Sequence, residues 1–319
     1  MADHNAERVT LARLPSGVEV ETTVHTYGSG DPLVYVQAAQ HGREINGTAV
    51  LRRLHEFLSA ATLDGTVVAV PVADPMTFDR VSYTTPEPFD SVNPNMNRCW
   101  PGDEEGTLHE RMAAALWAYA GDADFVVDLN TGSPDMLTHT VYLQGDEECR
   151  RLAEAFGTDL LLAEPAGEDA DAEWAERDFG GKFRVAATQE GIPAVTPELA
   201  HNKHLVEDAI ETGVEGTKRV LREVGVLADG ETVPSWDGLR ARNHLGRVKA
   251  DDSGLFRPSS DLRLGDEIGE GEVVGEVFDP TTYETLQTAT ANRDGIVYSI
   301  AREATVTAGQ TLVGIALPL

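Results

Sequence analysis

The alternation of short apolar runs with amphipathic segments constrains the fold of this chain more than any other feature of its sequence. Residues 33–39 form an apolar run typical of a buried strand, and the segment that follows places Val50, Leu54 and Leu58 on one helical face. The pattern recurs along the chain, with strand-like runs at 66–72, 125–129, 140–143 and 193–199 and helix-like segments at 107–119, 147–156 and 205–224. This alternation predicts an α/β fold with helices on both faces of a mixed or mainly parallel sheet.

The character of the sequence changes after about residue 235. Helical periodicity gives way to short β-like runs between glycine-containing turns, as at 246–248 and 294–298. We therefore expect two domains, an α/β domain over residues 1–235 and a smaller, barrel-like all-β domain over residues 236–319. The turns of the second domain resemble those of biotinyl and lipoyl carrier barrels, but no lysine follows Lys249, so we expect a structural or access-shaping role.

The charge balance is strongly acidic, with 54 Asp and Glu against 25 Lys and Arg and a formal net charge of -29. Nucleic acid is excluded as an expected partner because phosphate binding needs a basic surface. The acids are spread along the chain, and the composition resembles that of proteins from salt-loving archaea, where salt screens self-repulsion. The densest acidic stretch, residues 167–176, is expected to be a solvated surface loop.

The ends and the cysteines of the chain indicate a soluble cytoplasmic protein. The N-terminal residues lack the cationic and apolar regions of a secretory signal, and no apolar stretch approaches the ~18 residues of a membrane helix. The two cysteines, Cys99 and Cys149, have the spacing of neither a disulfide framework nor a zinc cluster.

A histidine and a glutamate three residues apart follow the first apolar run. At the end of a strand and the start of a helix, His41 and Glu44 can converge on one ion. Imidazole and carboxylate both suit Zn²⁺, and a catalytic zinc site with three protein ligands keeps a position for water. The spacing alone is weak evidence, since a loop histidine beside a helix-capping glutamate has the same pattern.

Four segments give this pair a context. Residues 40–47 (QHGREING) resemble the H-G-x-E-x-x-G signature of the succinylglutamate desuccinylase and aspartoacylase family, relatives of the zinc carboxypeptidases. Residues 95–102 (NMNRCWPG) are similar to its D-L-N-R-x-F-P-G segment and residues 127–132 (VDLNTG) to its D-L-H-T/S-G segment. Residues 193–199 resemble the strand that delivers the family's catalytic glutamate. The resemblance implies a zinc-carboxypeptidase-like mixed sheet flanked by helices, one Zn²⁺ per chain, and His41 and Glu44 as metal ligands.

The resemblance also implies roles for other residues. Glu198 would be the general base that takes a proton from the attacking water and passes it to the leaving amine. Arg98, next to Asn97, would grip a substrate carboxylate, with both residues in the substrate site. Arg80 would bind an anion or polarise the scissile carbonyl, although residues 84–93 make its separation from Arg98 longer than the family pattern.

Asn130 stands where the family has its third metal ligand, a histidine. The neutral amide oxygen of asparagine is a poorer zinc ligand than imidazole. Three explanations remain open from the sequence: His139 or His201 replaces the missing ligand, Asn130 itself coordinates through oxygen, or the protein has lost metal and catalysis.

We therefore expect a zinc-dependent deacylase or carboxypeptidase-like hydrolase that cleaves an amide bond in an N-acyl amino acid or a similar small carboxylated substrate. The alternative is a metal-poor small-molecule binding protein of the same fold. The sequence leaves open the acyl group, the amine and the oligomeric state, a homo-oligomer included.

Overall fold

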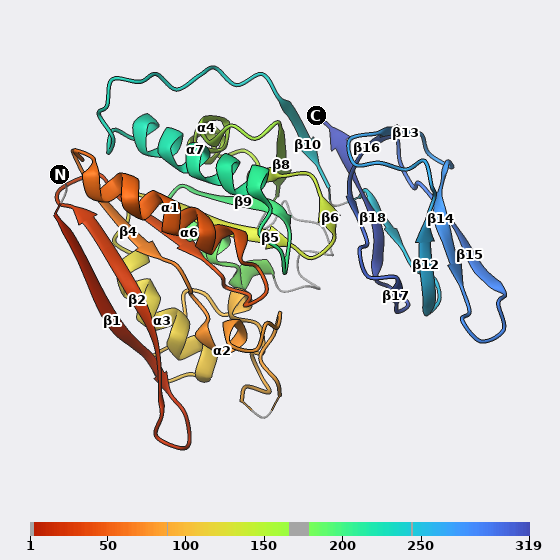
Figure 1. The fold of residues 1–319 in the computed structure, drawn as a ribbon, viewed down its shortest axis with the longest axis horizontal. Coiled ribbons are helices and arrows are strands. Elements are labelled where there is room, and N and C mark those ends of the chain that lie inside the picture. The colour runs from red at the N-terminus through yellow and green to blue at the C-terminus, as the bar shows by residue number, and fades with distance from the viewer. Residues whose placement is uncertain (1–2, 88, 166–178, 244) are drawn as a thin grey trace.

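A mixed β-sheet forms the centre of the protein (Figure 1). The computed structural model describes residues 3–87, 89–165, 179–243 and 245–319, so the acidic stretch 167–176 lies outside the described residues. In spatial order the strands of the sheet are β1 (His4–Arg13), β2 (Glu19–Gly28), β4 (Thr66–Val70), β3 (Leu33–Ala38), β5 (Phe125–Gly132), β9 (Ala194–His201), β7 (His139–Leu143), β8 (Leu160–Glu164) and β10 (Leu239–Arg242). Strands β4, β3, β5 and β9 are parallel, whereas β2 and β7 run antiparallel to their neighbours β4 and β9. The expected mixed α/β fold is confirmed.

Helices cover both faces of this sheet. Helices α1 (Asn46–Ala60), α4 (Glu147–Phe156) and α7 (Glu207–Glu223) pack against one face, and α3 (Leu108–Ala120) and α6 (Phe183–Gln189) against the other. Each face has its own apolar core, because the central strands are buried on both sides and carry near-continuous apolar runs. Shorter elements connect them: α2 (Pro75–Phe78), η1 (Met96–Arg98) and η3 (Phe179–Gly181).

The parallel strands bring distant parts of the sequence to one edge of the sheet. Strand β3 leads directly to His41, while Asn130 on β5 and Glu198 on β9 are Cα partners in adjacent strands. Their shared direction puts the carboxyl ends of these strands side by side, which is where open α/β sheets bind ligands.

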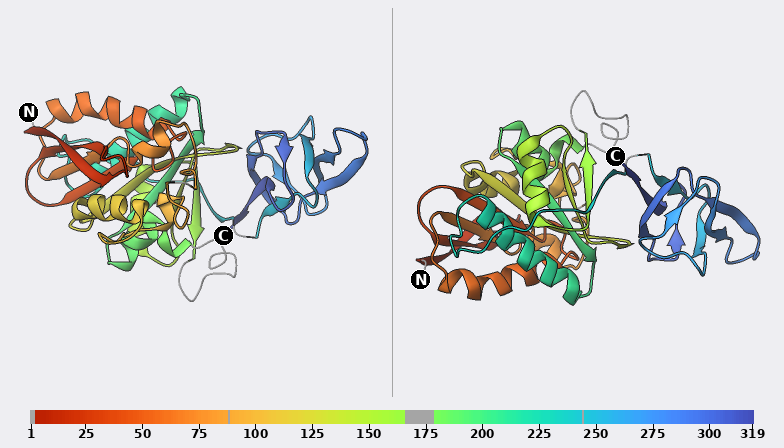
Figure 2. Two further views of the ribbon diagram at one scale, coloured as in Figure 1. Left: turned by 90° about the horizontal axis from the view of Figure 1, so that it is seen from below. Right: turned by 90° about the horizontal axis from the view of Figure 1, so that it is seen from above.

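The C-terminal region consists of antiparallel strands that lie at one end of the molecule (Figure 2). One sheet has the order β15 (Thr285–Thr290), β14 (Val273–Phe278), β12 (Gly254–Pro258) and β17 (Thr305–Val306). Beyond β10, the order of the central sheet continues with β18 (Thr311–Pro318), β16 (Gly295–Ile300) and β13 (Glu267–Ile268), and β11 (Arg247–Lys249) pairs with β18. Pairing of β18 with β10, and of β16 with β6 (Asp135–Met136), connects this region to the central sheet.

The hairpin of β1 and β2 was not expected from the sequence, and neither were β8 and α6. Strand β1 is mostly exposed at the edge of the sheet, so it lacks the apolar signal of a buried strand. Within the described ranges, no helix is both long and apolar enough to cross a bilayer.

Candidate active site

His41 and Glu44 lie together at the carboxyl end of β3, as the spacing predicted. Both side chains are buried, and Nδ1 of His41 lies 2.9 Å from Oε1 of Glu44. The backbone at residue 42, between them, passes so close to the Thr77 backbone that only glycine fits. A Cβ at Gly42 would come within 1.9 Å of the Thr77 backbone. Among the described residues, none forms a hydrogen bond with Nδ1 of His41. A buried histidine nitrogen that faces a buried carboxylate is an arrangement that two ligands of one cation can have.

The other ring nitrogen of His41 is fixed by Asn95. Nε2 lies 3.1 Å from the Asn95 side-chain oxygen Oδ1, which also accepts a hydrogen bond from the backbone N–H of Asn97. Because Oδ1 can only accept, Nε2 carries a proton, and in the neutral ring Nδ1 then keeps the free lone pair. The Tyr83 ring stacks on the imidazole, with centroids 3.9 Å apart and planes 19° apart. His41 is therefore held in the tautomer and orientation that a metal ligand needs.

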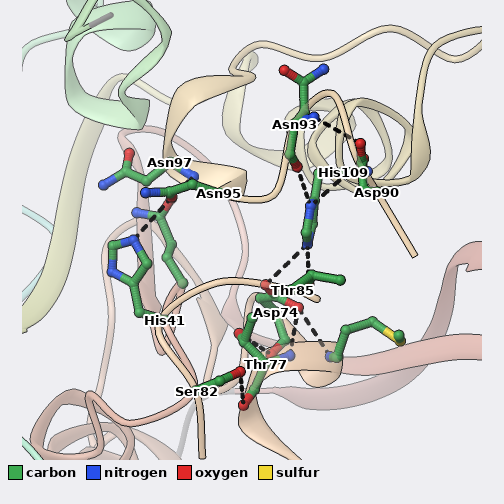
Figure 3. Close-up of polar contacts among 12 residues, drawn as sticks. His41, Asp74, Thr77, Ser82, Thr85, Asp90, Asn93, Asn95, Asn97 and His109 are labelled. Carbon is green, nitrogen blue, oxygen red and sulfur yellow. Dashed lines mark hydrogen bonds and ion pairs between the residues drawn. The ribbon is translucent and has the colours of Figure 1, made fainter. Parts of the chain in front are cut away.

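A buried histidine anchors the segment that carries Tyr83 and Asn95 (Figure 3). Nδ1 of His109 donates to the backbone oxygen of Asn93 (2.6 Å), and Nε2 faces Thr85 Oγ1 at 3.1 Å and Asp74 Oδ2 at 3.3 Å. The backbone N–H of His109 donates to Asp90. Burial opposes the charged form of His109, but hydrogen bonding to and attraction by Asp74 outweigh it, so the pKa of His109 is raised. His109 thus ties Thr85, Asp90 and Asn93 together.

Asn130 is oriented by a buried carboxylate. Its amide nitrogen donates to Asp128 Oδ2 at 2.9 Å, while Asp128 Oδ1 accepts from Gln37 at 3.2 Å and Gln40 at 2.7 Å. Burial raises the pKa of Asp128 to about 6 in spite of these three donors. Since the amide nitrogen is taken by Asp128, the oxygen is the atom with which Asn130 can contact a ligand.

Neither histidine considered as a replacement for a third ligand joins the pair formed by His41 and Glu44. His139 lines the cavity and is a Cα partner of Glu198, but His201 forms its contact with Asp135, 3.6 Å away. In the parts of the chain that the structure describes, no third His, Cys, Asp or Glu has a ligand atom within 4.8 Å of those of both His41 and Glu44. Burial also lowers the pKa of His139 to about 4, so its ring is neutral. Asn130, which lines the same cavity, is left as the candidate for the third position.

Glu198 lies on the wall of the same cavity, between Asn130 on β5 and His139 on β7. Burial, and then the negative charges of Glu44 and Asp128, raise its pKa to about 8. A carboxyl group of this kind can hold or release a proton near neutral pH, as a general base and acid must.

Two cationic side chains, Lys182 and Arg184, also line the cavity and form what we call the cationic wall. The sequence did not reveal this wall. Lys182 Nζ lies 3.0 Å from Glu164 Oε1, and the buried Arg184 is also ion-paired with Glu164. Lys182 Nζ lies 3.4 Å from the centroid of the Phe179 ring. Burial lowers the pKa of Lys182 to about 8 although Glu164 opposes this shift. The only signal for this wall was a Lys-x-Arg pair within a strongly acidic chain.

The arginines expected from the sequence differ in their placement. Arg98 lines the cavity and lies over the Phe179 ring, 5.1 Å from its centroid. Asn97 also lines it, and its side-chain oxygen accepts from the Phe183 backbone N–H. Arg80 is exposed, stacks on Phe89 and lies outside the cavity, so its geometry lends no support to a catalytic role.

These side chains surround a cavity of about 280 Å³, large enough for a small metabolite. The strand ends supply His41, Glu44, Asn130 and Glu198. The C-terminal region supplies Asn243, Arg247 and Tyr298. The cavity thus combines a ligand-like pair, a carboxyl group of raised pKa and several cations.

Known proteins resemble this chain over most of its length. Residues 31–224 match the succinylglutamate desuccinylase/aspartoacylase catalytic domain. The chain is 27% identical over 312 residues to an N-alpha-acetyl-L-2,4-diaminobutyric acid deacetylase of Halomonas elongata, covering 94% of this chain and 86% of that protein.

Solved structures share the fold over nearly the whole chain. A succinylglutamate desuccinylase/aspartoacylase from Rhodobacter sphaeroides superposes with a TM-score of 0.81 at 24% identity, covering 99% of this chain and 95% of that one. The ectoine utilization protein EutE (DoeB) from Ruegeria pomeroyi, in a product-bound structure, gives a TM-score of 0.82 at 20% identity, with the same coverage.

Proposed function

This chain belongs to the succinylglutamate desuccinylase/aspartoacylase family, and we propose that it is a zinc-dependent hydrolase of the amide bond in a small N-acyl amino acid. The observation that carries this proposal is the pair formed by His41 and Glu44: both side chains are buried, and Nδ1 of His41 lies 2.9 Å from the Glu44 carboxylate. A histidine that served only packing would satisfy both ring nitrogens with hydrogen bonds.

The residues at this site fit a zinc ion. His41 would bind through Nδ1 and Glu44 through a carboxylate oxygen, both common zinc ligands. Asn130 would complete the set through its amide oxygen, a weaker ligand, held in place by Asp128. Zinc in such a site supplies Lewis-acid polarisation of a carbonyl oxygen and lowers the pKa of water.

Glu198 is proposed as the proton acceptor and donor. Its carboxyl group faces the same cavity, and its raised pKa keeps transfer in both directions accessible near neutral pH. It would take the proton of the attacking water and give it to the leaving amine.

The cations of the cavity support a substrate with a carboxylate. Arg98 and Lys182 lie on the wall of the cavity, and guanidinium and ammonium groups are the usual partners of carboxylates. Asn97 keeps η1 in position through its bond to Phe183 and is proposed to help orient Arg98. The relative from Halomonas elongata suggests N-alpha-acetyl-2,4-diaminobutyrate as a first substrate to test.

Asn130 also favours a second candidate, a metal-poor binding protein that keeps the cavity without catalysis. The two candidates differ in their response to a restored histidine. We expect Asn130→His to bind zinc more tightly than the parent and to release acetate faster from N-acetylated amino acids. If Asn130→His gains zinc but does not hydrolyse the substrate, the result would support the binding protein. If the parent and Asn130→His both hydrolyse the substrate, the result would support the enzyme.

Other expectations remain predictions. We propose that residues 1–235 form the catalytic domain and that residues 236–319, which contribute to the cavity wall, form a domain that shapes access. A cytoplasmic location and adaptation to high salt are inferred from sequence alone, the latter from the net charge of -29.

A further inference from the structure

Three histidines that are distant in sequence meet on the surface of the protein away from the cavity. His4 lies on β1, His25 on β2 and His55 in the middle of α1. In the hairpin register His4 pairs with Tyr27 and Ala6 with His25, so His4, His25 and Tyr27 project from one face of the hairpin. That face is the one covered by α1, since the Tyr27 ring packs in the core cluster that contains Leu54 and Leu58.

The ring nitrogens of these histidines converge. His4 Nε2 and His25 Nδ1 are 3.1 Å apart, and one ring nitrogen from each of the three residues lies within 4.8 Å of the other two. Around a tetrahedral zinc with Zn–N bonds of about 2.0–2.1 Å, two ligand nitrogens are roughly 3.3 Å apart. The cluster therefore needs only a small contraction to hold an ion.

A hydroxyl group orients the third ring. Tyr27 Oη lies 2.9 Å from His55 Nδ1. With the proton on Nδ1 and donated to the hydroxyl oxygen, Nε2 of His55 keeps a free lone pair, the arrangement that metal-binding histidines commonly show.

The charge state of the cluster also suits a cation. Burial, followed by the neighbouring imidazoles, lowers the pKa of His4 and of His25. The groups facing these rings from the adjacent elements are Tyr27 from β2 and His55 from α1. Neutral imidazoles are the form that binds metals, so little proton release opposes binding at neutral pH.

We propose that His4, His25 and His55 form a second metal site, for a divalent transition-metal ion such as Zn²⁺, with a fourth position open to water. Three imidazoles with an open position suit zinc, and none of the three residues lines the active-site cavity. The site is thus separate from the pair formed by His41 and Glu44.

The consequence of binding is structural. Strand β1 is the outermost strand of the sheet, most of its residues are exposed, and β2 is the strand with which it pairs. An ion bound by all three histidines ties β1 to β2 and α1 and stabilises the folded state by mass action.

The test is the metal content of tag-free protein, equilibrated with Zn²⁺ and freed of excess ion. We expect His25→Gln, and separately His4→Gln, to bind about one zinc fewer per chain than the parent, because each removes one of three ligands. Loss of this ion should also abolish part of the rise in melting temperature that Zn²⁺ produces in the parent.

The matched control is His204→Gln, an exposed histidine that contacts Arg302 at the C-terminal region. It should keep the parent's zinc content. Since His4 is exposed on an edge strand, its replacement is expected to leave the fold intact, which circular dichroism without metal will verify. Equal zinc content in the parent, His4→Gln and His25→Gln would overturn the proposal and leave the cluster as an aromatic packing contact.

Discussion

Asn95 holds His41 by its Nε2 atom, 3.1 Å away, and thereby leaves Nδ1 to face Glu44. This relationship connects the segment that carries Asn95 with the two residues proposed as metal ligands. Loss of such outer hydrogen bonds to metal-ligating histidines commonly reduces metal affinity.

Asn95→Ala should therefore weaken zinc binding at the active site by roughly 10–100-fold while His41 and Glu44 remain in the chain. Competition with a chromogenic chelator will measure the affinity. The control is Asn93→Ala, whose backbone oxygen, not its side chain, bonds to His109. Equal zinc affinity in Asn95→Ala and the parent would show that the bond from His41 does not orient it for a metal.

Glu198→Gln should reduce kcat for amide hydrolysis by roughly 10²–10⁴ and leave the zinc content unchanged, because the amide keeps the shape but cannot exchange the proton. Acetate release and metal analysis on the same sample will separate the two effects. Unchanged kcat would remove Glu198 from the proton transfer, and lost zinc would make it a ligand instead.

The parts of the site that could be predicted from the sequence are those whose residues are close together in the chain or belong to a recognisable segment. His41 and Glu44 share one strand, loop and helix unit, so their spacing indicated their contact. Glu198 was placed through the resemblance of residues 193–199 to the strand that delivers the family's catalytic glutamate, and in the structure that strand lies beside β5. In contrast, Tyr83 reaches His41 from a loop whose course depends on the contacts of His109, and no periodicity encodes such a course.

The cationic wall and the N-terminal hairpin were missed for related reasons. Lys182 and Arg184 belong to a short helix and its cap, which have little pattern of their own. Strand β1 is exposed along most of its length, so its residues alternate weakly. Strand β2 did carry a usable signal, since Val20, Thr22 and Val24 alternate with polar residues and are buried.

Glu164→Gln should destabilise the protein by about 3 kcal/mol, because Lys182 and Arg184 then lose the largely buried carboxylate that they share. Chemical denaturation will measure the free energy of unfolding. The control is Glu147→Gln, whose exposed ion pair with Arg150 should make no measurable contribution. Equal stability of the two variants would contradict a structural role for Glu164.

His109 predicts a specific dependence of stability on pH. Its pKa is raised in the folded state, so the native protein binds this proton more tightly than the unfolded chain. The resulting stabilisation is fully present below the unfolded pKa of about 6.5 and is lost as pH rises through the folded pKa. The free energy of unfolding of the parent should therefore exceed that of His109→Gln by more at about pH 6 than at about pH 9. A difference that stays constant, or that widens with pH, would contradict this account.

The most direct test of a metal-dependent hydrolase is the zinc dependence of N-acetyl amino acid hydrolysis, measured on chelator-treated parent and Glu44→Gln before and after zinc is added. The treated parent should be inactive and regain acetate release with zinc. Glu44→Gln should stay inactive and bind about one zinc fewer per chain than the parent. Hydrolysis at the same rate with and without zinc, or in Glu44→Gln as in the parent, would contradict the central claim.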